Sequence, residues 1–211
     1  MTKRLIGLIA GQGDFPQLFA TEARRLGRRV IAVGFEGETD SKLAGLVDEM
    51  HWVKIGQLGK LLQTLKKTGV HEVAMLGTVR HVNLFRVRPD LRAAKLLARA
   101  KFKTGGALLG LVADEIEREG LHLVSTTQVL AEQIARRGPL THRRPTKAEE
   151  ADLEFGARVA KGIAGLDIGQ TVVIKDRAVV AVEAMEGTDE CIRRGGVICG
   201  AGAVVVKMAR P

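Results

Sequence analysis

Short apolar runs alternate with amphipathic segments through the first half of the chain. The runs are rich in β-branched residues and have the length of strands, whereas the segments between them place apolar residues at helical spacing and end near a glycine. The pattern predicts strands over residues 5–10, 30–35, 72–76 and 121–125, and helices over residues 15–26, 58–67 and 106–118. Because parallel strands joined through helices need right-handed crossovers, we expect a parallel sheet covered by helices on both faces.

The pattern changes after a stretch rich in arginine and proline, which we interpret as a linker over residues 133–146. The linker would separate a Rossmann-like nucleotide-binding domain, residues 1–132, from a second, smaller α/β domain, residues 147–211. The smaller domain is predicted to contain a helix over residues 147–163, a hairpin of strands 171–174 and 178–182, and a last strand over 203–208. The predicted fold class is therefore α/β, with two domains.

Composition narrows the class of protein. The chain has 211 residues, of which 45% are hydrophobic and 27% charged, as is typical of soluble globular proteins. No run approaches the roughly 18 uninterrupted apolar residues of a membrane span, and no signal-peptide pattern is present, so we expect a cytoplasmic protein. Cys191 and Cys199 lie outside any metal-binding pattern and are expected to be reduced thiols.

The net charge of +9 is concentrated in two segments. Residues 80–103 carry eight basic side chains against one acid, and residues 136–147 carry five against none. Such local charge favours an anionic ligand or an anionic membrane surface. Aromatic residues make up only 3% of the chain, so stacking platforms for single-stranded nucleic acid are scarce and we expect no nucleic-acid partner. Residues 90–103 have the spacing of a basic amphipathic helix, which could lie on a membrane, line a groove for acyl chains or be an ordinary solvated helix.

Two glycine-containing loops follow predicted strands, at the sheet edge where ligands of open α/β sheets bind. The first could present amides to a phosphate, and Glu36 after the next strand could accept a ribose hydroxyl. Pro16 stands where the dinucleotide fingerprint has its third glycine, so a purely structural turn is an equal alternative. The second loop could hold a phosphate or a sugar, or could be an ordinary polar loop. The candidate substrate-binding residues are Gly11, Gln12, Gly13 and Asp14 in the first loop and Gly77, Thr78 and Arg80 in the second.

Carboxylates gather where an apolar run ends, in the stretch from Val179 to Glu190. Carboxylate oxygens suit Mg²⁺ or Mn²⁺, and a strand would deliver them at fixed positions. Gly187 would allow the turn, and Thr188 or Asp189 would cap a short helix through Ile192. The alternative is an ordinary strand-to-helix turn with solvated acids. The candidate acids are Glu183, Glu186 and Asp189, of which Glu186 and Asp189 are the candidate metal ligands.

Five stretches distributed over nearly the whole chain carry a family resemblance. They are Gly7-Leu8-Ile9-Ala10-Gly11, Gly69-Val70-His71-Glu72-Val73, Arg88-Pro89-Asp90-Leu91-Arg92-Ala93, Leu166-Asp167-Ile168-Gly169-Gln170 and Val182-Glu183-Ala184-Met185-Glu186-Gly187-Thr188-Asp189. In these stretches the chain resembles the UDP-2,3-diacylglucosamine pyrophosphatases of the lipid A pathway, which are built from a Rossmann-like domain and a distinct carboxyl-terminal domain.

The resemblance implies hydrolysis of the pyrophosphate in UDP-2,3-diacylglucosamine to UMP and 2,3-diacylglucosamine 1-phosphate. It implies a divalent metal, Mg²⁺ or Mn²⁺, and a ligand held between the two domains. Members of the family continue into a further acidic segment and final strands beyond the position of Lys207, which this chain lacks. We therefore expect a carboxyl-terminal domain that is truncated relative to the family, and binding without hydrolysis is the alternative outcome.

This chemistry suggests a role for each candidate residue. Charge on the leaving oxygen must be neutralised, and a carboxylate must orient or deprotonate the attacking water. We assign metal or water handling to Glu183, Glu186 and Asp189, and uridine contact to the first glycine loop. Phosphate neutralisation is assigned to Lys175, Lys207 and Arg80, with Gly187 and Thr188 as further substrate contacts.

Other functions stay open at this point. A nucleotide-sugar or lipid-binding module would use the same loops without turnover. An NAD-dependent oxidoreductase would use Glu36 and the first glycine loop, although the missing third glycine counts against it. A nucleic-acid binder would show steep salt dependence and is the least favoured. The sequence leaves a homodimer and peripheral attachment to the inner membrane as open possibilities.

Overall fold

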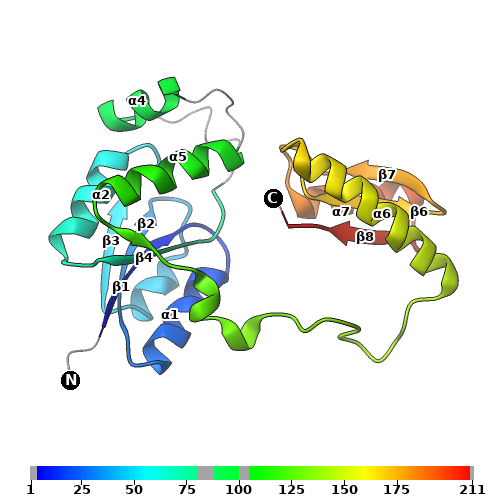
Figure 1. The fold of residues 1–211 in the computed structure, drawn as a ribbon, viewed down its shortest axis with the longest axis horizontal. Coiled ribbons are helices and arrows are strands. Elements are labelled where there is room, and N and C mark those ends of the chain that lie inside the picture. Colours follow the sequence, from blue (N-terminus) through cyan, green and yellow to red (C-terminus); the bar gives the residue numbers. More distant parts are fainter. Residues whose placement is uncertain (1–3, 80–87, 100–104, 210–211) are drawn as a thin grey trace. The chain divides into compact units, whose positions relative to one another are not determined.

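The computed structural model describes residues 4–79, 88–99 and 105–209, and the chain divides into two compact units (Figure 1). The first unit is Met1–Ala135 and the second is Arg136–Pro211. Residues 131–146, which include the whole of the predicted linker, are exposed throughout, and regular structure resumes at Lys147. Each unit has its own sheet and its own buried core, as described below.

The first unit is built on a sheet of five parallel strands in the order β3-β2-β1-β4-β5. The strands are β1 (Leu5–Ala10), β2 (Arg29–Phe35), β3 (Glu49–Val53), β4 (Glu72–Leu76) and β5 (His122–Leu123). The helices are α1 (Phe15–Arg25), α2 (Leu58–Lys67), α4 (Leu91–Arg99) and α5 (Gly105–Arg118), with short 3₁₀ turns at Ser41–Gly45, Thr126–Gln128 and Ala131–Gln133. The predicted parallel sheet is confirmed.

Two details of the strand pattern differ from the prediction. The sequence analysis missed β3, an edge strand in which only Val53 is fully buried, so that its residues do not form an apolar run. The predicted strand over residues 121–125 is reduced to two residues in β5. Both strands lie at the edges of the sheet, where one side has no strand to pair with and the burial that marks a central strand is reduced.

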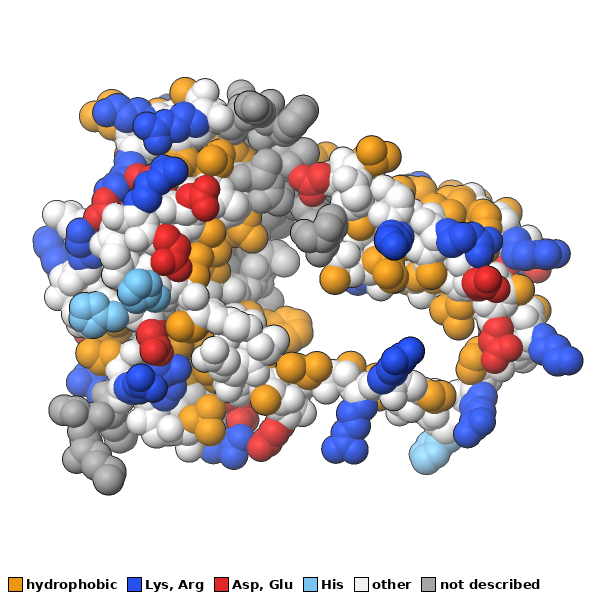
Figure 2. Space-filling view, in the orientation of Figure 1, with side chains coloured by type: hydrophobic (Ala, Val, Ile, Leu, Met, Phe, Trp, Pro, Cys, Tyr) orange, Lys and Arg blue, Asp and Glu red, His pale blue; other side chains and the backbone are white. Residues whose placement is uncertain are grey.

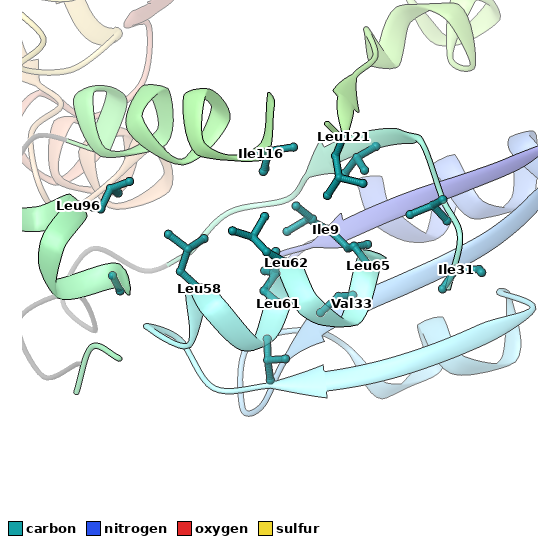
Figure 3. Close-up of a cluster of buried hydrophobic side chains, with 14 residues drawn as sticks. Ile9, Ile31, Val33, Leu58, Leu61, Leu62, Leu65, Leu96, Ile116 and Leu121 are labelled. Carbon is teal, nitrogen blue, oxygen red and sulfur yellow. The ribbon is translucent and has the colours of Figure 1, made fainter. Parts of the chain in front are cut away.

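Both faces of the first sheet are covered by helices, as predicted. On one face, α2 and α5 pack leucine and isoleucine side chains against the sheet (Figure 3). This cluster includes Ile9, Ile31, Val33, Leu58, Leu61, Leu62, Leu65, Ile116 and Leu121. On the other face, Phe19 and the small residues of α1 pack against alternate positions of the same strands, including Ile6, Leu8 and Val30. Because side chains of a strand alternate between faces, β1 contributes to both clusters and lies at the centre of the fold.

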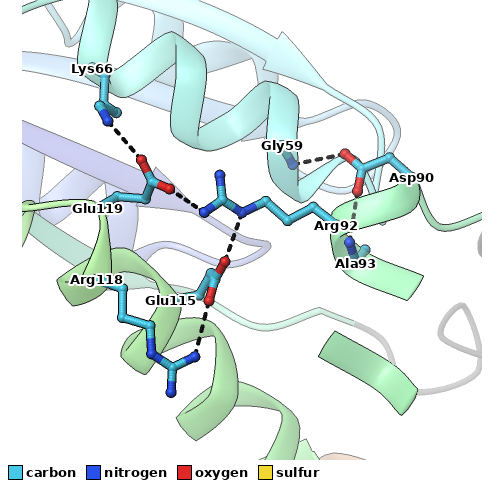
Figure 4. Close-up of polar contacts among 8 residues, drawn as sticks. All are labelled: Gly59, Lys66, Asp90, Arg92, Ala93, Glu115, Arg118 and Glu119. Carbon is cyan, nitrogen blue, oxygen red and sulfur yellow. Dashed lines mark hydrogen bonds and ion pairs between the residues drawn. The ribbon is translucent and has the colours of Figure 1, made fainter. Parts of the chain in front are cut away.

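Ion pairs and caps fix α4 against α2 and α5 (Figure 4). Asp90 accepts the backbone N–H of Ala93 at 2.8 Å, at the start of α4, and the backbone N–H of Gly59 at 2.8 Å, near the start of α2. Arg92 donates to Glu115 at 2.7 Å and also to Glu119. These hydrogen bonds raise the pKa of Arg92 and lower the pKa of Glu115. The predicted basic helix over residues 90–103 is therefore an anchored element, with its described part at Leu91–Arg99.

The second unit is a three-stranded antiparallel sheet with one helix packed on each face. Its elements are α6 (Lys147–Gly165), β6 (Thr171–Lys175), β7 (Ala178–Val182), α7 (Thr188–Cys199) and β8 (Val204–Lys207), and the strand order is β7-β6-β8. Ala160 of α6 packs with Val172 and Ile174 on one face. Cys191 of α7 packs with Val173 and Ala181 on the other. The predicted α/β class with a second, smaller domain is confirmed.

The predicted hairpin of the second unit is present and is held by a buried acid. Asp176 and Arg177 adopt φ values of 50° and 60°, which match the two central residues of a type I′ turn. Such values disfavour residues with a side chain. Asp152 of α6, only 6% exposed, accepts the backbone N–H groups of Asp176 and Arg177 at 3.0 and 2.6 Å. The turn therefore depends on a tertiary contact as well as on its own residues.

The packing of α6 gives a test of the second core. An added Cβ at Gly156 would lie 2.7 Å from Val206 Cγ2 and 2.9 Å from Ile174 Cγ1, both buried. We expect Gly156→Ala to destabilise the second unit by about 1–2 kcal/mol, because overpacking displaces these side chains. Gly162 lies on the same helix with nothing within 4 Å of its added Cβ, so Gly162→Ala should stabilise by roughly 0.5–1 kcal/mol. Urea unfolding of both variants measures the difference, and equal effects would contradict the packing.

Candidate functional site

In the first unit, the two glycine loops meet at one edge of the sheet. The first loop follows β1 and the second follows β4, and these strands are neighbours. The chain leaves β1 through α1 toward β2 on one side, whereas β4 lies on the other side. Ligands of open α/β sheets bind where the strand order reverses in this way. The fold therefore brings the predicted residues Gly11 to Asp14 together with Gly77 and Thr78.

Backbone hydrogen bonds join the two loops directly. Gln12 and Thr78 exchange two bonds, with N···O distances of 2.7 and 3.0 Å, and Gly11 N–H donates to Leu76 at 2.7 Å. An added Cβ at Gly11 would lie 2.6 Å from the carbonyl oxygen of Thr78. Gly77 has φ +90°, and its added Cβ would lie 2.7 Å from the backbone of Gly11. Both glycines are thus required for the loops to approach each other.

The same loops leave an exposed backbone surface. Gln12, Gly13 and Asp14 are exposed, and Gly13 has φ +102° with nothing within 4 Å of an added Cβ. Asp14 precedes α1 without a side-chain cap, and Pro16 in the first turn lacks an N–H donor. This helix terminus offers fewer amides to a phosphate than the dinucleotide fingerprint does. The arrangement suits contact with a nucleoside better than a cradle for a diphosphate.

The outcome differs for the two remaining predicted residues of the first unit, Arg80 and Glu36. Arg80 falls outside the residues that the structure describes. Glu36 is exposed just beyond the end of β2, and its backbone N–H donates to Val53 at 2.9 Å. Its side chain is accessible at the same edge of the sheet, one strand away from the first glycine loop.

In the second unit, Glu183 is a buried carboxylate with both oxygens engaged. It is 6% exposed and follows β7 directly. Oε2 accepts the backbone N–H of Gln170 at 3.2 Å, and Oε1 accepts the hydroxyl of Thr188 at 3.1 Å. An added Cβ at Gly169 would lie 2.0 Å from the Glu183 carbonyl oxygen, so the loop before β6 presses against this residue. Glu183 therefore links that loop to the start of α7 through hydrogen bonds, and each of its carboxylate oxygens accepts a hydrogen bond from the protein.

Thr188 connects Glu183 to a lysine at the end of the last strand. Lys207 Nζ donates to Thr188 Oγ1 at 2.8 Å, and Thr171 Oγ1 lies 3.2 Å from the same atom. Thr171 and Lys207 are also paired in register across β6 and β8. The predicted residues Glu183, Thr188 and Lys207 therefore form one polar cluster at one end of the sheet. Thr171 also belongs to this cluster. The sequence analysis missed it, although a threonine at the start of a strand of valine and isoleucine indicates a polar position there.

Glu186 stabilises the turn between β7 and α7. Its Oε2 accepts the N–H of Ala184 at 3.1 Å, and its Oε1 accepts from Arg194 at 2.7 Å. A hydrogen bond from its own backbone N–H, together with the bond from Arg194, holds the pKa of Glu186 below its usual value against the opposing effect of burial. Arg194 also donates to the Val182 carbonyl at 2.9 Å. Glu186 is thus charged at neutral pH and tied to an arginine that the sequence analysis did not select.

The start of α7 corrects the predicted cap. Gly187, with φ 88°, occupies the N-cap position, and no side chain caps the helix, so neither Thr188 nor Asp189 has that role. Instead, the Thr188 hydroxyl is used by Glu183 and Lys207. The helix runs to Cys199 and not only to Ile192. The amides of its first turn are therefore free of side-chain caps, and Asp189 in that turn is exposed.

Lys175, which was predicted to neutralise phosphate together with Lys207, lies at the other end of the sheet from Lys207 and Glu183. It ends β6, opposite Ala178, whereas Glu183 lies beside Thr171 at the beginning of that strand. Its Nζ donates to the carbonyl groups of Cys199 and Ala201 at 2.8 and 2.9 Å. A cation at this position satisfies the carboxyl end of α7. The predicted grouping of Lys175 with Lys207 around one phosphate is therefore not present.

The carboxylates of the β7–α7 turn do not form a ready metal site. Among residues 4–79, 88–99 and 105–209, no three His, Cys, Asp or Glu side chains are grouped so that they could hold an ion. Glu183 faces Thr188 and Gln170, and Glu186 faces Arg194 and Ala184. Asp189 alone of the three acids projects from an exposed helix turn. The expected Mg²⁺ or Mn²⁺ stays a prediction, and no chemical step is derived through it.

Two protein-family models together match almost the whole chain. Residues 5–133 match the model described as LpxI N-terminal domain, and residues 136–211 match the LpxI C-terminal domain. The chain belongs to the LpxI family. The two LpxI models meet within the exposed stretch that separates the two compact units.

A curated relative gives the family a named activity. The chain is 34% identical over 194 residues to "UDP-2,3-diacylglucosamine pyrophosphatase LpxI" of Caulobacter vibrioides (strain ATCC 19089 / CIP 103742 / CB 15). The match covers 90% of this chain and 69% of the relative. The family resemblance predicted from the five sequence stretches is confirmed at the level of the LpxI family.

Solved structures add weaker similarities. An ADP complex of the N5-carboxyaminoimidazole ribonucleotide synthetase purK is similar over 100% of this chain and 49% of that chain, at 13% identity and a TM-score of 0.37. The Kluyveromyces lactis urea carboxylase is similar over 80% of this chain and 12% of that chain, also at 13% identity and a TM-score of 0.37. Similarity at this level supports no conclusion on substrate or mechanism.

Glu183 is buried and Asp189 is exposed, so their replacement should change the free energy of unfolding by different amounts. Glu183→Ala leaves the Gln170 N–H and the Thr188 hydroxyl without their buried acceptor, so we expect a loss of about 1–3 kcal/mol. Asp189→Ala removes only a favourable charge at a helix start and should cost no more than about 1 kcal/mol. Urea unfolding compares the two variants. Unchanged stability of Glu183→Ala would show that this carboxylate is not structural.

Proposed function

We propose that the chain hydrolyses the pyrophosphate bond of UDP-2,3-diacylglucosamine, giving UMP and 2,3-diacylglucosamine 1-phosphate, as a step of lipid A biosynthesis. The observation that carries the proposal is the consecutive match to both LpxI domains, with 34% identity to a relative that bears this activity in its name. The substrate has three chemically different parts: a nucleoside, a diphosphate and an acylated sugar. The described residues offer contacts for the first two.

The nucleoside is proposed to contact the paired glycine loops of the first unit. The exposed loops present the side-chain amide of Gln12, the hydroxyl of Thr78 and the backbone of Gly13, which no side chain covers. Such groups can pair with the donors and acceptors of a uracil ring. Asp14 and Glu36 are exposed carboxylates near this edge and could accept ribose hydroxyls. Gly11 and Gly77 contribute by permitting the close approach of the loops.

The diphosphate is proposed to contact the start of α7. Lys207 supplies a positive charge beside Thr188, and the uncapped amides that follow Gly187 supply donors at the positive end of the helix dipole. Two acids of the first turn oppose a bound phosphate, but Glu190 is paired with Arg193, whereas Asp189 forms no salt bridge with any residue that the structure describes. Its exposed carboxylate is suited to take a proton from water as that water attacks phosphorus.

The other acids of the turn are assigned positioning roles under this proposal. Glu183 holds Thr188 and the start of α7, and Glu186 with Arg194 holds the preceding turn. Neither carboxylate touches substrate in this scheme. The requirement for Mg²⁺ or Mn²⁺, the contribution of Arg80 and a homodimer stay separate proposals. Activity measured with each metal and with a chelator tests the first of them.

Turnover tests the proposed acid. We expect Asp189→Ala to lower UMP release from UDP-2,3-diacylglucosamine by about 10²–10⁴-fold, because the proton acceptor for water is lost. Its stability should remain close to that of the unmodified chain, as argued above. Chromatographic quantification of UMP measures the rate. Full turnover by Asp189→Ala would remove Asp189 from the mechanism, and absence of turnover by the unmodified chain with retained UDP binding would support a binding module.

Nucleotide binding tests the loops of the first unit. Gly77→Ala should weaken UDP binding at least tenfold, because its Cβ would separate the two loops at an unfavourable φ. Gly120→Ala is the matched control, since Gly120 has φ +76° with nothing within 4 Å of an added Cβ and lies after α5. Calorimetric titration with UDP and with NAD compares the variants. Preferential binding of NAD by the unmodified chain would favour an oxidoreductase.

A further inference from the structure

One helix of the first unit presents cations and an exposed leucine on its outward face. Within α4, Ala93 and Leu96 are 8% and 6% exposed and face the core. At 100° per residue, the opposite face contains Leu91, Ala94, Lys95 and Ala98, and Arg99 lies at the edge of that face; all five residues are exposed. Leu91 is 84% exposed, which is high for a leucine on an anchored helix. Figure 2 shows Lys and Arg side chains together with hydrophobic atoms over this element.

The inward contacts of α4 leave this face unused. Arg92 is bonded to Glu115 and Glu119, and Asp90 is bonded to the starts of α2 and α4 (Figure 4). Lys66 also donates to Glu119 at 2.7 Å, so Glu115 of α5 and Glu119 just after that helix are already paired. The charged residues that anchor α4, Arg92 and Asp90, are therefore different from the cations that α4 exposes to solvent. The outward side chains can be changed without breaking the anchor.

The outward cations have no acidic partner among the residues that the structure describes. Arg88, just before the helix, and Lys95 and Arg99 within it form no ion pair in that part of the chain. The only acid between residues 88 and 99, Asp90, is occupied by backbone N–H groups. Lys95 and Arg99 beside Leu91, and Arg88 just before the helix, are therefore three positive charges without an acidic partner in the described part of the chain. An anionic surface complements these charges, and an apolar interior complements the leucine.

Two shallow grooves lie beside α4. The first has a volume of about 500 Å³ on the α2 side, where Lys66, Lys67 and Arg92 contribute cations, and a second groove of about 380 Å³ lies on the other side. The second groove is lined by Leu91, Arg92, Lys95, Leu96, Arg99 and Glu115. Cationic heads above aliphatic stems match the boundary between lipid phosphates and acyl chains. A nucleic acid would match the charges but would leave Leu91 exposed.

We propose that the outward face of α4 docks the protein on an anionic lipid bilayer. Arg88, Lys95 and Arg99 contact lipid phosphates, and Leu91 enters the interfacial layer. None of the helices in the described ranges is long and apolar enough to cross a membrane, and docking by a nine-residue helix is reversible. This inference rests in part on the proposed function, because a diacylated substrate resides at such a surface. Its test does not depend on turnover.

The test is sedimentation of the full chain with phosphatidylcholine vesicles, with and without phosphatidylglycerol. We expect binding to the anionic vesicles alone and weakening as salt is raised. The triple variant Arg88→Gln, Lys95→Gln, Arg99→Gln should lose about a hundredfold in partitioning, or about fivefold for each cation. The control Lys42→Gln, Lys54→Gln, Lys60→Gln removes the same charge from exposed positions elsewhere in the unit and should lose much less.

A second pair of variants tests the leucine independently of charge. Leu91→Ser should lose roughly tenfold in partitioning, because less apolar surface is buried. Val197→Ser, at a position 83% exposed in the second unit, is the matched control and should bind as the unmodified chain does. Equal losses for the two charge variants, or unchanged binding of Leu91→Ser, would overturn the proposal. Loss of RNA binding by the α4 triple variant with vesicle binding unchanged would also overturn it.

Measurements of UMP release distinguish the docking proposal from the proposed pyrophosphatase function. If both are correct, the α4 triple variant should release UMP at the normal rate from detergent-dispersed UDP-2,3-diacylglucosamine and more slowly from substrate embedded in anionic vesicles. Vesicle binding through α4 without any UMP release would support the docking surface and count against the pyrophosphatase. Normal UMP release in both settings by the triple variant would count against docking through this helix.

Discussion

A parallel sheet must bury both of its faces, and this requirement organises the first unit of the chain. Strand β1 supplies Ile6 and Leu8 to the α1 side and Ile9 to the α2 side, so no side chain of its centre reaches solvent. Polar chemistry is thereby confined to the ends of the strands, where the backbone leaves the sheet. The loops after β1 and β4 meet there, and two glycines remove the side chains that would separate them. The position of the candidate nucleoside contact follows from burial.

A buried carboxylate has the corresponding role in the second unit. The small sheet has two edge strands and little apolar area, and its loops are fixed by polar contacts to backbone groups. Glu183 holds the loop before β6 and the start of α7, while Asp152 holds the hairpin turn. A carboxylate with two well-placed donors can be buried at acceptable cost, whereas the same group without partners could not. Asp189 in the first turn of α7 is exposed, and it is the acid to which the proposed function assigns the attacking water.

The charges of the chain fall into two classes that composition cannot separate. Arg92 is paired with Glu115 of α5 and with Glu119 just after that helix, and Lys66 of α2 is also paired with Glu119, so both cations act within the fold. Lys95 and Arg99 follow Arg92 in α4 and are exposed, and they have no acidic partner among the residues that the structure describes. Both sets belong to the basic segment recognised from the sequence. Tertiary contacts separate the two classes, because the helical repeat places Arg92, Lys95 and Arg99 near one another and only Arg92 reaches Glu115 and Glu119.

The sequence by itself determined the central strands, the helices, the α/β class and the LpxI family, because these depend on local periodicity and on motifs that are contiguous in the chain. It did not reveal β3, whose exposed edge position weakens the apolar pattern, or the true cap at Gly187. It also assigned Lys175 and Lys207 together to phosphate neutralisation. Only the tertiary structure showed that antiparallel pairing sends Lys207 to the end that carries Thr171 and Glu183, and Lys175 to the opposite end. Strand direction is a nonlocal property, and it decides which side chains share a site.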